Sequence, residues 1–207
     1  MLNPFKLLAR LLIVGSVVLW LAHHYQRIAV EPLLPLIKTT IESVQDVFTV
    51  QSLDIVEDGP NQVIRLRSNL AKPTYVNGRV FYPIGWNSTQ QGGYEITLTA
   101  GGTILYSLLT LIVALSWPAT HWRVLLTRLL ISLPLMLGLV VLNVAITFPA
   151  ELWNPIHDEW VPDITWPLLV SSRMLMGGGG LMLGLLCGAL AIVASMGRRE
   201  TPAAIKQ

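Results

Sequence analysis

Charged side chains are scarce in this sequence of 207 residues. Aspartate, glutamate, lysine and arginine make up 13% of the chain, whereas about a quarter of a typical soluble domain is charged. Hydrophobic residues account for 53%, and the mean hydropathy is +0.58. This composition excludes an ordinary soluble domain and predicts an integral membrane protein.

Cysteine is almost absent, since Cys187 is the only one in the chain. A single cysteine excludes an intramolecular disulfide, and its place in an apolar run argues against a thiolate nucleophile. The 14 lysines and arginines exceed the 12 acidic residues by two and are spread over short segments. A nucleic-acid partner is therefore not expected, because such proteins gather their basic residues into a patch or stripe.

Long apolar runs, by contrast, are plentiful. A helix needs about 20 residues to cross the roughly 30 Å of bilayer hydrocarbon. Four runs come close to this length, at residues 7–22, 101–118, 129–148 and 174–196. The first resembles a signal peptide, but no small-x-small cleavage site follows it, so we expect an uncleaved anchor. The fold class predicted is a mainly α-helical membrane protein with four transmembrane helices.

The sizeable polar segment between the first two runs, residues 24–100, is expected to form a small α+β domain. Its start is typical of an amphipathic helix over residues 31–48, with apolar residues at three- and four-residue steps: Leu34, Ile37, Ile41, Val44 and Phe48. Two β-rich runs then flank Asp58 and Gly59, which is a hairpin signal. Further strands are expected around a polar turn at 87–93. The sequence thus predicts a helix followed by an antiparallel sheet of three to five strands.

Basic residues near the ends of the apolar runs predict the orientation of the chain. Seven fall on one side of the expected membrane, against the single acid Glu200: Lys6, Arg10, Arg123, Arg128, Arg198, Arg199 and Lys206. The loop expected at 149–165 has four acidic residues and no lysine or arginine. Both termini are therefore expected in the cytoplasm of a bacterium, with 24–100 and 149–165 in the periplasm. Four tryptophans are expected at the outer interface: Trp20, Trp153, Trp160 and Trp166.

These expectations define four parts of the chain. A transmembrane anchor covers 1–23, and the periplasmic domain covers 24–100. A three-helix transmembrane region with one periplasmic loop covers 101–196, and a cytoplasmic tail covers 197–207. The protein is accordingly placed in the bacterial inner membrane.

The stretch SSRMLMGGGGLMLGLL, residues 171–186, contains four consecutive glycines. Gly180, Gly184 and Gly188 recur every four residues, which is the small-xxx-small pattern that lets transmembrane helices approach closely. The ridge packs either against another span of the same chain or against a different protein, and internal packing is favoured because four spans must pack together. The glycines outside the ridge permit a kink or a close backbone contact.

Few polar residues accompany these apolar runs. Asn143 is expected to hydrogen-bond to a neighbouring helix. Arg173 is either interfacial or, if residues 164–172 also enter the bilayer, an intramembrane arginine of functional interest. In the soluble segment, Arg65 and Arg67 are two residues apart on a strand and therefore share a face. They are either a solvated surface or a site for an acidic partner.

Neither a catalytic nor a metal site is predicted. The segment 24–100 has no serine–histidine–acid spacing and no phosphate-binding loop, so no catalytic residue, metal or cofactor is expected. A metal site would need to gather residues whose spacing is not specific: His23, His24, His157, Met174 and Met176. A membrane enzyme at the outer interface stays open as an alternative, with four residues as its candidates: Glu151, His157, Asp158 and Glu159.

The order of segments resembles a known family. One anchor, a β-rich segment, and three spans with the basic turn HWRVLLTRLL and the glycine-rich helix GGGGLMLGLL are similar to the small accessory membrane proteins associated with exosortases. These transpeptidases process C-terminal sorting signals. The resemblance covers the whole chain as architecture. The exosortase activity itself is not expected, because it requires an outward-facing cysteine nucleophile and Cys187 lies deep in the fourth run.

The resemblance and the residues together predict a non-enzymatic accessory or structural subunit of a multi-protein inner-membrane complex. Its expected partners are other integral membrane proteins and the lipid bilayer, contacted through the periplasmic domain and the glycine-rich last helix. A small-molecule or metal-ion transporter is the alternative from another class. That class would require polar groups to converge inside the helix bundle, which only Asn143 and Arg173 offer.

Overall fold

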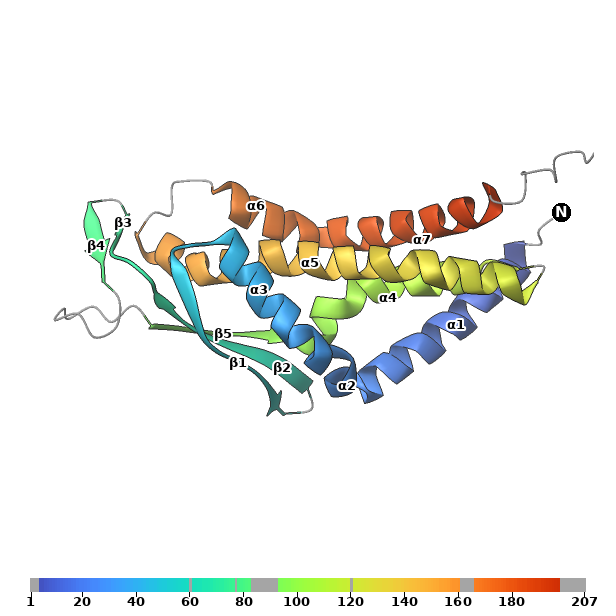
Figure 1. Cartoon of the computed structure of the whole chain (residues 1–207), viewed down its shortest axis with the longest axis horizontal. Coiled ribbons are helices and arrows are strands. Elements are labelled where there is room, and N and C mark those ends of the chain that lie inside the picture. Colours follow the sequence, from blue (N-terminus) through green and yellow to red (C-terminus); the bar gives the residue numbers. More distant parts are fainter. Residues whose placement is uncertain are drawn as a thin grey trace, which may run out of the picture. The chain divides into compact units, whose positions relative to one another are not determined.

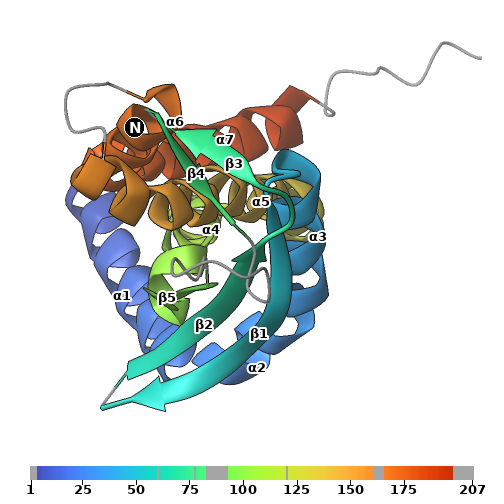
Figure 2. The same ribbon diagram turned by 90° about the vertical axis from the view of Figure 1, so that its left-hand side faces the viewer.

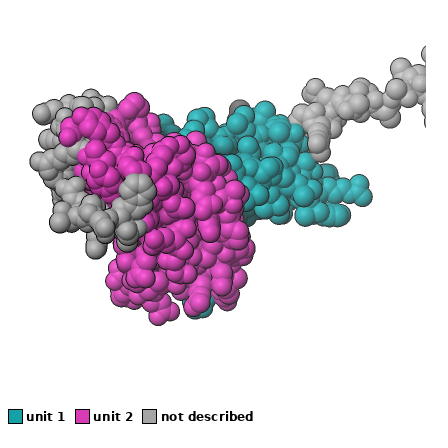
Figure 3. Space-filling model, turned by 60° about the vertical axis from the view of Figure 1, so that its left-hand side comes forward, with its two compact units in different colours: residues 1–24, 105–140, 179–207 teal, residues 25–104, 141–178 magenta. Residues whose placement is uncertain are grey.

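The computed structural model describes residues 4–59, 61–76, 78–82, 93–119, 121–160 and 166–197. The chain forms two compact units (Figure 3). Unit 1 comprises Met1–His24, Leu105–Val140 and Gly179–Gln207, and unit 2 comprises Tyr25–Ile104 and Val141–Gly178. Helices α4 (Ala100–Ser116) and α5 (Trp122–Trp160) contribute residues to both units.

Every secondary-structure element described in unit 1 is a helix. It contains α1 (Pro4–His24), α7 (Gly180–Gly197) and parts of α4 and α5, which are drawn in Figure 1. Large apolar side chains point outward along these helices, and several are more than half exposed: Leu12, Ile13, Leu130, Leu133, Leu186 and Val193. Apolar residues on the outside of helices are the arrangement expected where lipid, and not water, is the solvent.

Three helical stretches among the described residues are long and apolar enough to cross a membrane: Pro4–His24, Trp122–Pro155 and Pro167–Met196. They correspond to the first, third and fourth runs of the sequence. The second run forms α4, which is apolar but has only 17 residues. The prediction of a mainly helical membrane protein is thus confirmed at the level of three candidate spans.

Helix α5 is much longer than the sequence indicates. It has 39 residues, and at a rise of 1.5 Å per residue it is about 58 Å long. The prediction of a loop at 149–165 is therefore wrong for residues 149–160, because the chain is helical as far as Trp160. Residues 161–165 lie outside the described residues. Val144, Phe148 and Leu152 explain the continuation. These three residues lie four residues apart and are almost fully buried, so the apolar face of the helix continues past residue 148, where the apolar run of the sequence ends.

The antiparallel sheet predicted for unit 2 is present (Figure 2). Its strands are β1 (Phe48–Asp58), β2 (Asn61–Leu70) and β5 (Gly93–Thr99), in the order β1-β2-β5. The predicted hairpin is confirmed, because Asp58 pairs with Asn61 and Gly59 takes a positive φ of 58° in the turn. A separate two-stranded sheet pairs β3 (Thr74–Val76) with β4 (Arg79–Phe81). The turn expected at 87–93 falls outside the described residues up to residue 92.

The helix predicted over 31–48 is shorter than expected. The chain forms α2 (Gln26–Val30), the 3₁₀ turn η1 (Glu31–Leu33) and then α3 (Leu34–Val44). Ile37 and Ile41 are buried, and α3 contacts β1. Val44 is 45% exposed, and Phe48 is a buried residue of β1. The period of the apolar residues thus ran across a helix-to-strand junction, and the helix covers the sheet.

Candidate functional site

The glycine ridge of α7 faces α4 of the same chain, within unit 1. A Cβ added at Gly184 would lie 2.5 Å from the carbonyl oxygen of Tyr106, and one added at Gly188 would lie 2.6 Å from Cβ of Val113. At Gly180 an added Cβ would overlap the ring of Tyr106. Any side chain here would push the two helices apart. Of the two arrangements that the sequence allows, the structure has internal packing.

Two buried hydrogen bonds start from side chains of α4 in unit 1, one joining α4 to α7 and the other lying within α4. Thr110, which is fully buried on α4, donates its hydroxyl to the carbonyl oxygen of Gly184 at 3.1 Å. Ser116 donates to the carbonyl oxygen of Ile112 within α4 at 2.6 Å. The first bond crosses between helices at the middle of the glycine ridge. Sequence reasoning missed Thr110, although a threonine inside an apolar run was a visible signal.

Arg128 is the polar residue that sequence reasoning most misjudged. The sequence predicts a charge that flanks a span, yet the residue is only 2% exposed. Its Nε donates to Oγ of Ser195 on α7 at 3.0 Å, and its Nη1 donates to the carbonyl oxygen of Trp117 at 2.7 Å. Its Nη2 lies 3.4 Å from the carbonyl oxygen of Pro118. The guanidinium thus joins α5 to α7 and to the end of α4, where helix carbonyls would otherwise need partners.

Asn143 behaves as predicted. It is buried on α5 in unit 2, and its Nδ2 donates to the carbonyl oxygen of Thr103 on α4 at 3.0 Å. Its Oδ1 accepts a hydrogen bond from the hydroxyl of Thr147 at 3.0 Å. Both ends of the amide are therefore used, which is how a buried polar side chain avoids the cost of desolvation. Asn143 holds two helices together.

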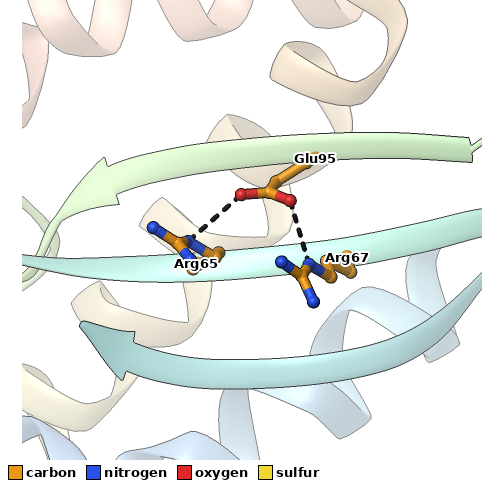
Figure 4. A network of polar contacts seen from close by, with 3 residues as sticks. All are labelled: Arg65, Arg67 and Glu95. Carbon is orange, nitrogen blue, oxygen red and sulfur yellow. Dashed lines mark hydrogen bonds and ion pairs between the residues drawn. The ribbon is translucent and has the colours of Figure 1, made fainter.

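The predicted pair Arg65 and Arg67 shares one face of β2 and meets Glu95 of β5 (Figure 4). Their Nε atoms lie 3.1 Å and 2.9 Å from the two carboxylate oxygens of Glu95. Asp54 of β1 is the register partner of Arg65 on the other side of β2, so a second acidic residue lies next to the two arginines. The charges balance within the chain. An external acidic partner would have to displace Glu95.

Helix α6 (Pro167–Met174) and α7 are separated by a π-helical turn, η2 (Leu175–Gly179). Gly178 has a φ of +118°, a conformation that residues other than glycine rarely adopt, so of the two arrangements left open for these glycines the chain has a kink. A Cβ added at Gly177 or Gly178 would meet no atom within 4 Å. Arg173 is exposed near the end of α6, just before this turn. The kink thus explains the glycines that lie outside the ridge.

Aromatic rings form a cluster in unit 2. The ring of Trp153 lies 5.2 Å from that of Phe48 and 4.8 Å from that of Trp166, and Trp166 lies 6.2 Å from the buried ring of His157. Trp153 is only 8% exposed. The prediction that Trp153 faces a lipid interface is therefore wrong, because its ring packs against the sheet. This cluster attaches the C-terminal part of α5 to β1.

The candidate residues for metal binding or catalysis form no metal-binding cluster among the described residues. Within the part of the chain that the structure describes, no group of three or more histidine, cysteine, aspartate or glutamate residues is placed to hold a metal ion. The ring of His24 stacks on Trp20 of the same helix, with centroids 5.7 Å apart. Glu151 is half-buried, and the side chains of Asp158 and Glu159 lie outside the described residues.

A groove of about 340 Å³ lies beside the sheet in unit 2. Leu34, Pro35 and Lys38 of α3 form one wall, and residues 50–53 of β1 form the other. The strand pairing slips between Val50 and Ser52, so a bulge lies in the groove. Bulges often occur at sheet edges next to functional sites. Sequence reasoning missed this groove, because it depends on how α3 packs on β1.

The chain was compared with protein-family models, with curated proteins and with solved structures, and none of the three comparisons found a match.

Proposed function

We propose that the chain is a non-enzymatic accessory subunit of a multi-protein complex in a bacterial inner membrane. Its partners are other integral membrane proteins, and unit 2 contacts them on the periplasmic side. The four spans are residues 1–23, α4, α5 and the stretch formed by α6 and α7. Both termini lie in the cytoplasm.

The hydrogen bonds made by polar side chains in the apolar helices are the observation that carries this proposal. Thr110, Arg128 and Asn143 each donate to an oxygen atom on another helix or at the end of one. Polar groups that handle a transported solute converge instead on a cavity or pathway. The groups described here hold the helices in place, which favours a scaffold over a transporter.

The length of α5 supports the placement across the membrane. Its length of about 58 Å is nearly twice the roughly 30 Å of hydrocarbon, so a large part of it projects into water. Arg123 lies near its N-terminal end, while Glu151 and His157 lie near its C-terminal end. Under the positive-inside rule the N-terminal end is cytoplasmic and the other end periplasmic. Helix α4, with 17 residues, is at the lower limit for a span.

Unit 2 is the more suitable surface for a partner. The glycine ridge is occupied by α4, whereas the sheet of unit 2 has an edge strand and a groove outside its core. The resemblance of the chain to exosortase-associated accessory proteins makes a membrane transpeptidase of that class the first partner to look for.

The proposal is tested by purifying the tagged chain in mild detergent from cells that express it at its native level, followed by quantitative mass spectrometry. We expect one or more integral membrane proteins at near-equal amounts. Gly138→Ala serves as a control for a substitution that leaves the helix packing unchanged, because an added Cβ at this site meets no atom within 4 Å. A chain that purifies alone, both as wild type and as the control, would refute the proposed role.

A second experiment tests the orientation. Green fluorescent protein fused after Gln207 becomes fluorescent only if the C-terminus is cytoplasmic, and alkaline phosphatase inserted after Asp58, in the hairpin turn, is active only in the periplasm. We expect both signals. Fluorescence without phosphatase activity would contradict the periplasmic placement of unit 2.

A further inference from the structure

Strand β1 offers an edge for another strand. It has 11 residues, and in the sheet order β1-β2-β5 it is paired with β2 alone among the described residues. An exposed edge presents backbone N–H and C=O groups that an added strand satisfies. The middle of this edge, residues 50–53, is also the wall of the groove beside α3. Backbone pairing and side-chain contacts are therefore available at the same place.

The bulge in β1 leaves one residue of this edge without a partner on β2. Gln51 falls between two paired residues, Val50 with Ser68 and Ser52 with Arg67, and has no cross-strand partner itself. Gln51 is exposed, and Val50 is nearly buried. The groove thus presents an apolar floor and an unpaired polar residue side by side.

Lys38 is the only charged residue among the described residues that line the groove. Its Nζ lies 3.9 Å from Oε1 of Glu42 on the same helix, and both side chains are nearly half exposed. An exposed pair of this kind contributes little to stability. A carboxylate brought into the groove would therefore compete for Lys38 at little cost.

We propose that this groove binds an extended peptide segment of a partner protein, which pairs with the edge of β1 and places a carboxylate against Lys38. The inference rests on the proposed function, because it names the kind of segment that the accessory subunit recognises. Four residues of β1 cover about 13 Å, and a volume of about 340 Å³ is at the small end of ligand pockets. The segment recognised is thus short, with small or branched apolar residues around one acidic residue.

The test uses the full-length protein in nanodiscs and two fluorescein-labelled peptides, Thr-Val-Leu-Asp-Val-Thr and Thr-Val-Leu-Lys-Val-Thr. Binding is measured by fluorescence anisotropy for the wild type and for Lys38→Glu. Arg27→Glu is the matched control, because Arg27 and Glu31 form an exposed helix pair four residues apart at the same 3.9 Å but do not line the groove. Both variants reverse one exposed charge, so both are expected to fold.

We expect the wild type and Arg27→Glu to prefer the aspartate peptide, and Lys38→Glu to bind it about five- to tenfold more weakly and to prefer the lysine peptide. Absence of peptide binding, or equal binding by both variants, would overturn the inference. Binding of dodecanoate in place of the peptides would also overturn it, in favour of a lipid. If pull-downs from cells recover the same partners with Lys38→Glu as with Arg27→Glu, the accessory role stands and the groove is not its docking site.

Discussion

Replacing Gly184 by alanine tests the packing of α7 on α4 directly. An added Cβ at this position would lie 2.5 Å from the backbone oxygen of Tyr106 and 3.1 Å from Cβ of Leu109. Ordinary contacts of a Cβ begin at 3.4 Å, so the helices must separate by almost 1 Å. A backbone atom on α4 cannot rotate away, unlike the tip of a side chain. The strain therefore falls on the whole helix pair.

The expected loss of stability has two contributions. Overpacking of a close-packed site costs typically about 1–3 kcal/mol. Separation of the helices also lengthens the 3.1 Å hydrogen bond from Thr110 to Gly184, and such a bond between membrane helices is worth about 0.6 kcal/mol on average. The better helix propensity of alanine offsets up to about 1 kcal/mol of this loss, so we expect Gly184→Ala to lower the free energy of unfolding by roughly 1–3 kcal/mol.

Gly138→Ala is the matched control, because Gly138 lies in a helix of the same unit and its added Cβ meets no atom within 4 Å. Alanine is the better helix former by about 1 kcal/mol in water, so this variant should be neutral or slightly more stable. Both free energies are measured by equilibrium unfolding in mixed micelles with circular dichroism as the signal. Equal stability of the two variants would refute close packing of α7 against α4.

Three further outcomes are expected. Arg128→Gln should lower the free energy of unfolding in micelles by roughly 2–3 kcal/mol, because buried hydrogen bonds from a charged donor are lost. A change within 0.5 kcal/mol would contradict the role of Arg128 in joining α5 to α7. Asn143→Leu should cost about 1 kcal/mol in the same assay, and an unchanged midpoint would argue against its bond to α4. The hydrogen bond and the charge of Lys72 hold the pKa of Asp46 below its ordinary value of 3.8. Lys72→Ala should therefore raise that pKa toward 3.8, as measured by carboxyl NMR titration. The stabilisation from the pair is present above about pH 4 and is lost as the pH falls through the folded-state pKa, and an unmoved titration would show that the pair does not form in solution.

Local patterns in the sequence were sufficient where neighbouring residues decide the outcome. The hairpin follows from Asp58 and Gly59, since a tight turn needs a residue that tolerates positive φ. The shared face of Arg65 and Arg67 follows from the two-residue period of a strand.

Residues whose roles depend on distant segments were harder to predict. Arg128 has the sequence signature of a flanking charge, and only the approach of Ser195 and of the end of α4 makes it a buried clamp. Pro149 directly follows the apolar run at 129–148, and proline is disfavoured in the interior of a helix. Burial of Phe148 and Leu152 keeps the helix continuous nevertheless. Tertiary contacts thus outweighed the local propensity.

The route of α5 also has a consequence for the order of synthesis. Strands β1, β2 and β5 emerge from the ribosome before residues 141–160, yet Trp153 from that later segment packs on Phe48 of β1. Domains usually fold as their chain is completed. Part of the apolar face of the sheet is therefore uncovered until residues 141–160 of α5 have been made. Completion of the core of unit 2 thus depends on α5, which is also a candidate membrane span, so a chain that ends before residue 141 would have all the strands of the sheet and an incomplete core.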